Sequence, residues 1–149
     1  MKTALSLIGE WQILLCDEKE EYFFPHPITN YMKLNYKYPA IYRWNVYSNS
    51  IRDESLLYIG EAQSLCPDRL KNYLKPGPSQ KTSRRIHDMF NEFSSQGMKI
   101  QMEVFDFERI TIDEVALVQK DLSQKHVRLL IEQLLVTIYR RKGVTLLNL

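Results

Sequence analysis

The pattern of apolar and polar residues along the chain predicts three β-strands. Residues 40–47 (AIYRWNVY) and 56–60 (LLYIG) are rich in β-branched and aromatic side chains, which favour strands. The short polar connection between them indicates an antiparallel pair. Residues 98–104 alternate apolar and polar side chains with the period of a half-buried strand. Residues 5–16 fit a helix or a strand equally well, so the pattern leaves their structure open.

Two helices are predicted between the second and third of these strands. Pro67 suits the first turn of a helix, where a missing N–H costs little, and a Pro-Gly-Pro segment downstream stops this helix. A second helix is expected over residues 84–95. Thr82 or Ser83 can cap its start, and Gly97 lies just past its end.

Two further helices are predicted after the third strand. Residues 111–114 (TIDE) match a capping box, which opens a helix. Ser123 can begin the last helix, whose apolar residues recur at helical spacing until Gly143 ends it. The resulting order β-β-α-α-β-α-α predicts an α+β fold with a small three-stranded, mostly antiparallel sheet flanked by helices.

The chain of 149 residues is long enough for one domain around one core. We interpret residues 1–38 as an N-terminal extension that packs on this core, and residues 39–149 as the main part of the domain. No apolar run reaches the roughly 18 residues of a membrane span, and no secretory cleavage site follows the N-terminal apolar patch. Because Cys16 and Cys66 are the only cysteines, we expect a cytoplasmic protein with no disulfide framework and no membrane association.

The distribution of charge says more than the net charge of +2. Between residues 69 and 87 the chain carries six Lys or Arg residues and no acidic residue. Such a patch can neutralise phosphate groups, although a solvated surface that happens to lack acids is an equal interpretation. The residues expected to contact nucleic acid are Lys71, Lys75, Lys81, Arg84 and Arg85. His87 is expected on a helix surface and is assigned no catalytic role.

Two tripeptides and the segment after the second resemble a known family. Residues 40–42 (AIY) and 58–60 (YIG) lie on the first two predicted strands and are similar to the GIY and YIG tripeptides of the GIY-YIG nuclease family. Residues 58–74 (YIGEAQSLCPDRLKNYL) are similar to the segment that follows YIG in that family. Arg69 and Tyr73 are spaced so that both side chains share one helical face.

The C-terminal part completes the resemblance, which covers roughly residues 39–149. Glu132 lies in the long apolar helix and Asn148 follows shortly after it, in the order of the family's acid and asparagine. The resemblance implies the GIY-YIG fold and a DNA endonuclease that uses Mg²⁺ or Mn²⁺. The catalytic set that it implies is Tyr42, Tyr58, Arg69, Tyr73, Glu132 and Asn148, with Glu132 as the metal ligand.

The chemistry of these residue types agrees with phosphodiester hydrolysis. A guanidinium such as that of Arg69 can contact two phosphate oxygens at once and stabilise added negative charge. Magnesium keeps several waters and often needs only one or two carboxylates, so Glu132 alone can anchor it. Nearby cations can lower a tyrosine pKa, which would let Tyr58, or else Tyr42, take a proton from the attacking water.

Two alternatives stay open at this stage. The chain can be a non-catalytic nucleic-acid-binding module on the same fold, or an α+β interaction protein in which Glu132 pairs with Arg128 on its own helix. Glu61, directly after the second tripeptide, would repel DNA unless it helps to hold metal. The distance of 16 residues between Tyr42 and Tyr58 predicts a long hairpin loop around residues 48–54. The DNA that is cut, and the choice between a monomer and a homodimer, are left open.

Overall fold

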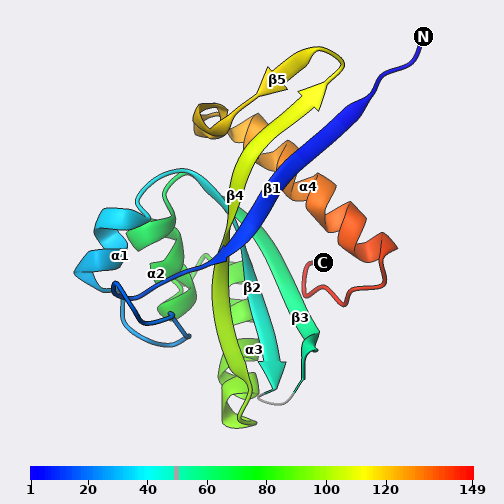
Figure 1. Cartoon of the computed structure of the whole chain (residues 1–149). Coiled ribbons are helices and arrows are strands. Elements are labelled where there is room, and N and C mark those ends of the chain that lie inside the picture. The colour runs from blue at the N-terminus through cyan, green and yellow to red at the C-terminus, as the bar shows by residue number, and fades with distance from the viewer. Residues whose placement is uncertain (49–50) are drawn as a thin grey trace.

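An open sheet of five strands forms the centre of the fold (Figure 1). The structure is a computed structural model and describes residues 1–48 and 51–149. The strands lie in the order β1-β4-β2-β3, with β5 paired to β4 outside this path. Every pair of these strands is antiparallel. The strands are β1 (Leu5–Ile13), β2 (Ala40–Ser48), β3 (Ile51–Ala62), β4 (Lys99–Ile112) and β5 (Val115–Leu117).

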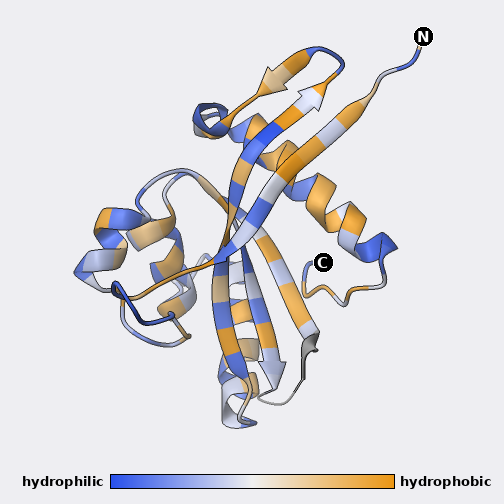
Figure 2. Ribbon diagram, in the orientation of Figure 1, coloured by the Kyte–Doolittle hydropathy of each residue, from blue (hydrophilic) through white to orange (hydrophobic). Residues whose placement is uncertain are grey.

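Helices cover both faces of this sheet (Figure 1). On one face Trp44 packs with Leu70 and Phe90 from the helices that follow β3. On the other face Ile41 packs with Ile131 of the last helix. The strands alternate between hydrophobic and hydrophilic residues along much of their length (Figure 2), because successive side chains point to opposite faces of the sheet. The helices are α1 (Asn30–Asn35), the π-helical turn η1 (Leu65–Arg69), α2 (Leu70–Leu74), α3 (Lys81–Ser95), the 3-10 turn η2 (Gln119–Ser123) and α4 (Lys125–Arg141).

The α+β class is confirmed, but the sheet is larger than the three strands predicted. The ambiguous segment at residues 5–16 contributes β1, which pairs with β4 along its whole length. The prediction of a long hairpin loop around residues 48–54 is wrong, because β2 extends to Ser48 and β3 begins at Ile51. The additional residues therefore lengthen the strands. Residues 49 and 50 of this hairpin lie outside the described part.

The helix predicted from the capping box at residues 111–114 is wrong. Strand β4 continues to Ile112, and a tight turn then leads into β5. Asp113 adopts a left-handed conformation with φ 55°, which aspartate tolerates better than most residues. Its carboxylate accepts a hydrogen bond from the backbone N–H of Ala4 at 3.0 Å. Because β4 has partners on both sides here, sheet pairing overrides the local capping signal.

The other helices are close to their predicted positions. The segment that begins near Pro67 forms η1 and α2, and Gly97 follows α3 with φ 79°. The predicted caps are wrong in detail, because α3 begins at Lys81 and α4 at Lys125, each preceded by a glutamine. None of the helices in the described part is long and apolar enough to cross a membrane.

Candidate active site

Tyr42 and Tyr58 come from neighbouring strands and face the same side of the sheet. In the register of β2 and β3, Tyr42 lies opposite Gly60 and Tyr58 lies opposite Trp44. A Cβ atom at Gly60 would overlap the ring and hydroxyl of Tyr42, so the tyrosine fills the space that the missing side chain leaves. The glycine of the second tripeptide is therefore required by the tyrosine of the first.

This close approach gives the first testable prediction. Gly60→Ala is expected to lower the free energy of unfolding by about 1–3 kcal/mol, the usual cost of overpacking a buried site. Urea denaturation followed by circular dichroism measures the change. Gly77→Ala is the matched control, because a Cβ there would approach no described atom closer than 3.6 Å. Equal urea midpoints for the two variants would contradict the steric argument.

A hydrogen-bonded tyrosine cluster lies where β2, β3 and α2 meet. The hydroxyls of Tyr42 and Tyr73 are 2.5 Å apart, and both side chains are buried. The ring of Tyr73 also lies edge-on to that of Tyr58, with centroids 6.3 Å apart. Tyr73 belongs to the helix face that carries Arg69, as its spacing predicted. The three tyrosines of the predicted set are thus in one place, although Tyr42 and Tyr73 have little contact with solvent.

Burial sets the protonation state of these tyrosines. Loss of hydration raises the pKa of Tyr42, and the same effect raises the pKa of Tyr58 and of Tyr73. Arg69 opposes the shift for each of the three without reversing it. The expectation that neighbouring cations lower the tyrosine pKa is therefore wrong for the protein alone, because desolvation is the larger effect. At neutral pH the cluster consists of neutral hydroxyl groups.

Arg69 and Glu132, from different helices, both lie within electrostatic range of this cluster. Arg69 ends η1, and Glu132 reaches the same place from α4. Burial raises the pKa of Glu132, the charge of Glu61 raises it further, and the guanidinium of Arg69 lowers it. Tyr42 is close enough to both to be affected by the charges of Arg69 and Glu132. The structure therefore brings together two tyrosines on strands, a third on α2, one guanidinium and one carboxylate.

Glu132 has no cationic partner in an ion pair within the described residues. Its carboxylate is half-buried and accepts one hydrogen bond, from Nε2 of Gln133 at 3.1 Å. The predicted alternative, an ion pair with Arg128 on the same helix, is wrong. Because the protein supplies so few donors, the oxygen atoms of Glu132 are available to solvent or to a ligand. Its oxygen atoms are the type that hard divalent cations prefer.

Arg128 instead forms a buried ion pair with Glu61. Its Nε lies 2.6 Å from Oε2 of Glu61, and only 5% of the arginine side chain and 13% of the glutamate side chain are exposed. The same guanidinium donates to the carbonyl oxygens of Leu122 at 2.9 Å and Ser123 at 3.1 Å. The acid next to Gly60 is thus neutralised within the protein. No sequence signal indicated this pair, because the helical spacing of Arg128 indicated Glu132 as its partner.

The side chain of Asn148 forms hydrogen bonds with the backbone of the edge strand β3. Its side-chain amide donates to the carbonyl of Ile59 at 2.8 Å, and its side-chain oxygen accepts from the N–H of Ile59 at 2.9 Å. Leu57 makes two further backbone hydrogen bonds with the same C-terminal segment. Asn148 therefore takes the place of a strand partner beside Tyr58 and Gly60, which makes it a positioning residue for the second tripeptide.

The predicted cationic residues lie on the helices beside the cluster. Lys71 is 3.8 Å from the carboxylate of Asp68, and both side chains are largely exposed. Arg85 on α3 donates to the carbonyl of Leu147 at 3.1 Å and lowers the pKa of Tyr58, so it is adjacent to the cluster. Arg84 donates to the carbonyl of Gly77 at 3.3 Å. Lys75 and Lys81 are exposed.

His87 on α3 is hydrogen-bonded to the backbone of α2. Its Nδ1 lies 2.5 Å from the carbonyl oxygen of Tyr73, and Nδ2 of Asn91 lies 3.0 Å from its Nε2. Since the amide donates to Nε2, the proton of a neutral ring is on Nδ1 and is donated to Tyr73. The ring also packs edge-on against Phe24. His87 is therefore half-buried rather than on the helix surface, and it supports the backbone of a cluster residue.

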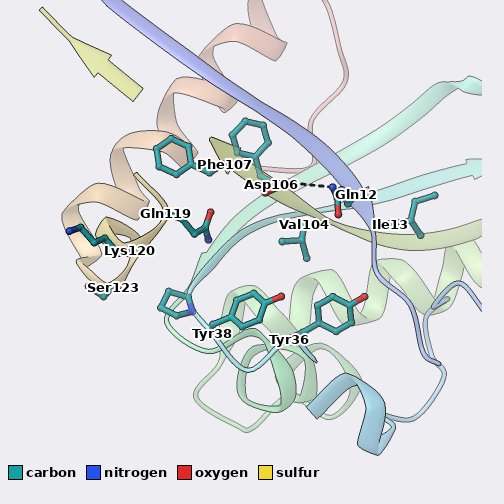
Figure 3. Close-up of a pocket in the computed structure, with 12 residues that line it drawn as sticks. Gln12, Ile13, Tyr36, Tyr38, Val104, Asp106, Phe107, Gln119, Lys120 and Ser123 are labelled. Atoms are coloured by element: carbon teal, nitrogen blue, oxygen red, sulfur yellow. Dashed lines mark hydrogen bonds between the residues drawn. The ribbon is translucent and has the colours of Figure 1, made fainter. Parts of the chain in front are cut away.

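A polar cleft lies beside Arg69, and a second cavity of similar volume lies apart from the predicted site residues. The cleft has a volume of about 570 Å³ and runs from the end of β3 to α2. The other cavity, about 580 Å³, lies between β1, β4 and the segment before β2 (Figure 3). It contains none of the predicted site residues, and its walls include Gln12, Tyr36, Tyr38, Asp106, Phe107 and Lys120. Of the predicted catalytic residues, Arg69 alone belongs to the lining of the polar cleft.

Comparison of the chain with known protein families, with curated proteins and with solved structures found no match.

Proposed function

We propose that this chain is a metal-dependent DNA endonuclease of the GIY-YIG type, on a GIY-YIG fold formed by residues 39–149. The observation that carries the proposal is the meeting of Arg69 and Glu132 with Tyr42, Tyr58 and Tyr73 around one place. These side chains come from two strands and two helical segments that are far apart in the sequence. They lie in the order that the family resemblance requires, and Arg69 also lines an open polar cleft.

Arg69 is the residue that binds the scissile phosphate. Its side chain makes no ion pair within the described residues, so its donors are free for an anion. A guanidinium can contact two phosphate oxygens and stabilise the charge that develops in the transition state. Lys71, Lys75, Lys81 and Arg84, with Arg85, would neutralise the backbone phosphates of DNA on either side.

Glu132 is the residue that would hold the metal ion. Its half-buried carboxylate lacks a described cationic partner, and its oxygen atoms suit Mg²⁺ or Mn²⁺, so the residues present fit such an ion. The ion, when bound, would stabilise negative charge on the phosphate and on the leaving oxygen. The pairing of Glu61 with Arg128 removes an acid that would otherwise repel the substrate.

The tyrosines orient the attacking water and the phosphate as neutral hydroxyls. Tyr58 is the least buried of the three, so its hydroxyl is the one that a water molecule can reach and donate to. Tyr42 and Tyr73 share a hydrogen bond, which keeps the hydroxyl of Tyr73 in place beside Tyr58. Asn148 fixes the backbone of β3 at Ile59 and so holds Tyr58 at the site.

Incubation with supercoiled plasmid DNA tests the proposal. The purified chain is expected to nick or linearise the plasmid in Mg²⁺ or Mn²⁺ and to be inactive when a chelator removes the ion. Gel electrophoresis over a time course measures both. Undiminished cutting in the chelator would contradict metal dependence, and an intact plasmid in every divalent ion would contradict the enzyme.

The raised pKa of the tyrosines favours one alternative, a DNA-binding module without catalysis. Without an ionised base, the same cations would still bind phosphates, with an affinity that falls steeply as salt rises. This alternative predicts a salt-dependent gel shift of the plasmid with no change in its topology. The plasmid experiment therefore separates the two functions directly.

A further inference from the structure

The cleft beside Arg69 is polar on every wall. It is lined by the end of β3, the turn η1 and the first turn of α2, and its volume of about 570 Å³ lies within the range of about 300–1,000 Å³ found for ligand pockets. The residues that line it are Gln63, Ser64, Asp68, Arg69 and Asn72. No apolar side chain belongs to this set, which distinguishes the cleft from a hydrophobic groove.

Three of the side chains that line this cleft have no partner among the described residues. Among the described residues, the carboxamides of Gln63 and Asn72 and the guanidinium of Arg69 make no hydrogen bond to another group. Asn72 is half-buried and lies one helical turn after Arg69, on the same side of the segment. Gln63 lines the cleft from the connection between β3 and η1. Two free carboxamides therefore flank the residue assigned to the scissile phosphate.

We propose that this cleft is the subsite for the nucleotide next to the scissile phosphate, and that Asn72 and Gln63 recognise its base. This inference rests on the proposed function. A carboxamide carries one donor and one acceptor side by side, which matches the N6 and N7 edge of adenine in a bidentate pair. The edge of guanine presents acceptors and that of cytosine presents a donor, so a carboxamide makes only a single hydrogen bond with either base. Adenine is therefore the base favoured in the cleft.

Asp68 indicates how a bound nucleotide would be oriented in the subsite. It is the only acid among the lining residues, and its carboxylate is at the rim, 3.8 Å from the Lys71 ammonium and 64% exposed. Its charge repels a phosphate, whereas Arg69 attracts one. The sugar-phosphate backbone would therefore pass along the Arg69 side of the cleft, and the base would face the two amides.

The experiment measures DNA binding without cleavage. The wild type, Asn72→Ala and Gln63→Ala are titrated into fluorescein-labelled duplexes in a chelator, and fluorescence anisotropy gives each dissociation constant. Loss of a bidentate amide contact is expected to weaken binding at least about fivefold and to remove the preference for adenine at one flanking position. Gln96→Ala, an exposed amide beyond the end of α3, is the matched control and should bind like the wild type.

The outcomes separate this inference from the proposed function. Circular dichroism should show that both variants keep the fold, because neither carboxamide has a partner within the described protein. Binding by Asn72→Ala and Gln63→Ala equal to that of the control would overturn the subsite, even if the wild type cuts DNA. Weakened binding by both would support it, even if no ion allows cleavage. A wild type that binds no duplex would overturn the subsite and the nuclease together.

Discussion

Arg69→Ala and Glu132→Gln are each expected to lower plasmid cleavage by at least about a hundredfold while the fold is retained. Removal of a single preorganised group that stabilises transition-state charge usually costs a factor of about 10²–10³. Neither side chain has an ion-pair partner among the described residues, so its loss leaves no buried charge unpaired. Initial cleavage rates in Mg²⁺, with circular dichroism of each variant, measure the effect.

The controls for these variants are residues of the same charge elsewhere. Arg109→Ala removes an exposed cation on β4, and Glu108→Gln removes an exposed acid on the same strand; both should stay within a few-fold of the wild type. Arg69→Lys keeps the charge without the planar fork and should recover only part of the activity. Cleavage by either site variant at more than a tenth of the wild-type rate would contradict the assignment.

The central hairpin of the fold could be predicted from the sequence because its signal is local. Residues 40–47 and 56–60 carry β-branched and aromatic side chains in a strand pattern, and both are strands. Strand β5, joined to β4 by a tight turn, was missed because the capping pattern predicted a helix there. Strand β1 was left open, because its pairing with β4 joins residues about a hundred positions apart. The capping signal at residues 111–114 failed for the same reason: a neighbouring strand determines that segment.

The candidate site divides in a similar way. The proximity of Arg69 and Glu132 was expected only from the family resemblance, because their order in the sequence does not place them near each other. The partner of Arg128 could not be predicted, because Glu132 at helical spacing and Glu61 on a distant strand are equally plausible from charge alone. The protonation of Tyr58 was predicted wrongly, because the loss of hydration depends on packing that no local pattern describes.

Arg128→Met is expected to destabilise the protein by about 3–5 kcal/mol, the cost of removing one partner from a buried ion pair. The guanidinium is 5% exposed and is the cation that pairs with Glu61. The methionine would leave the carboxylate of Glu61 unpaired in a largely desolvated position. It would also leave the carbonyl oxygens of Leu122 and Ser123 without this donor. Urea denaturation gives the free energy of unfolding.

A double variant distinguishes the ion pair from simple loss of packing. Glu61→Gln combined with Arg128→Met removes the unpaired charge and should be more stable than Arg128→Met alone. Arg141→Met, at the exposed end of the same helix, should change the free energy of unfolding by no more than about 0.5 kcal/mol. If the double variant were no more stable than Arg128→Met, the carboxylate of Glu61 would not be the group that needs the arginine.

Because α4 carries both Arg128 and Glu132, the pair with Glu61 fixes this helix against β3. In the proposed nuclease, the metal ligand and Tyr58 come from these two elements, so the proposed site depends on a contact that includes neither residue.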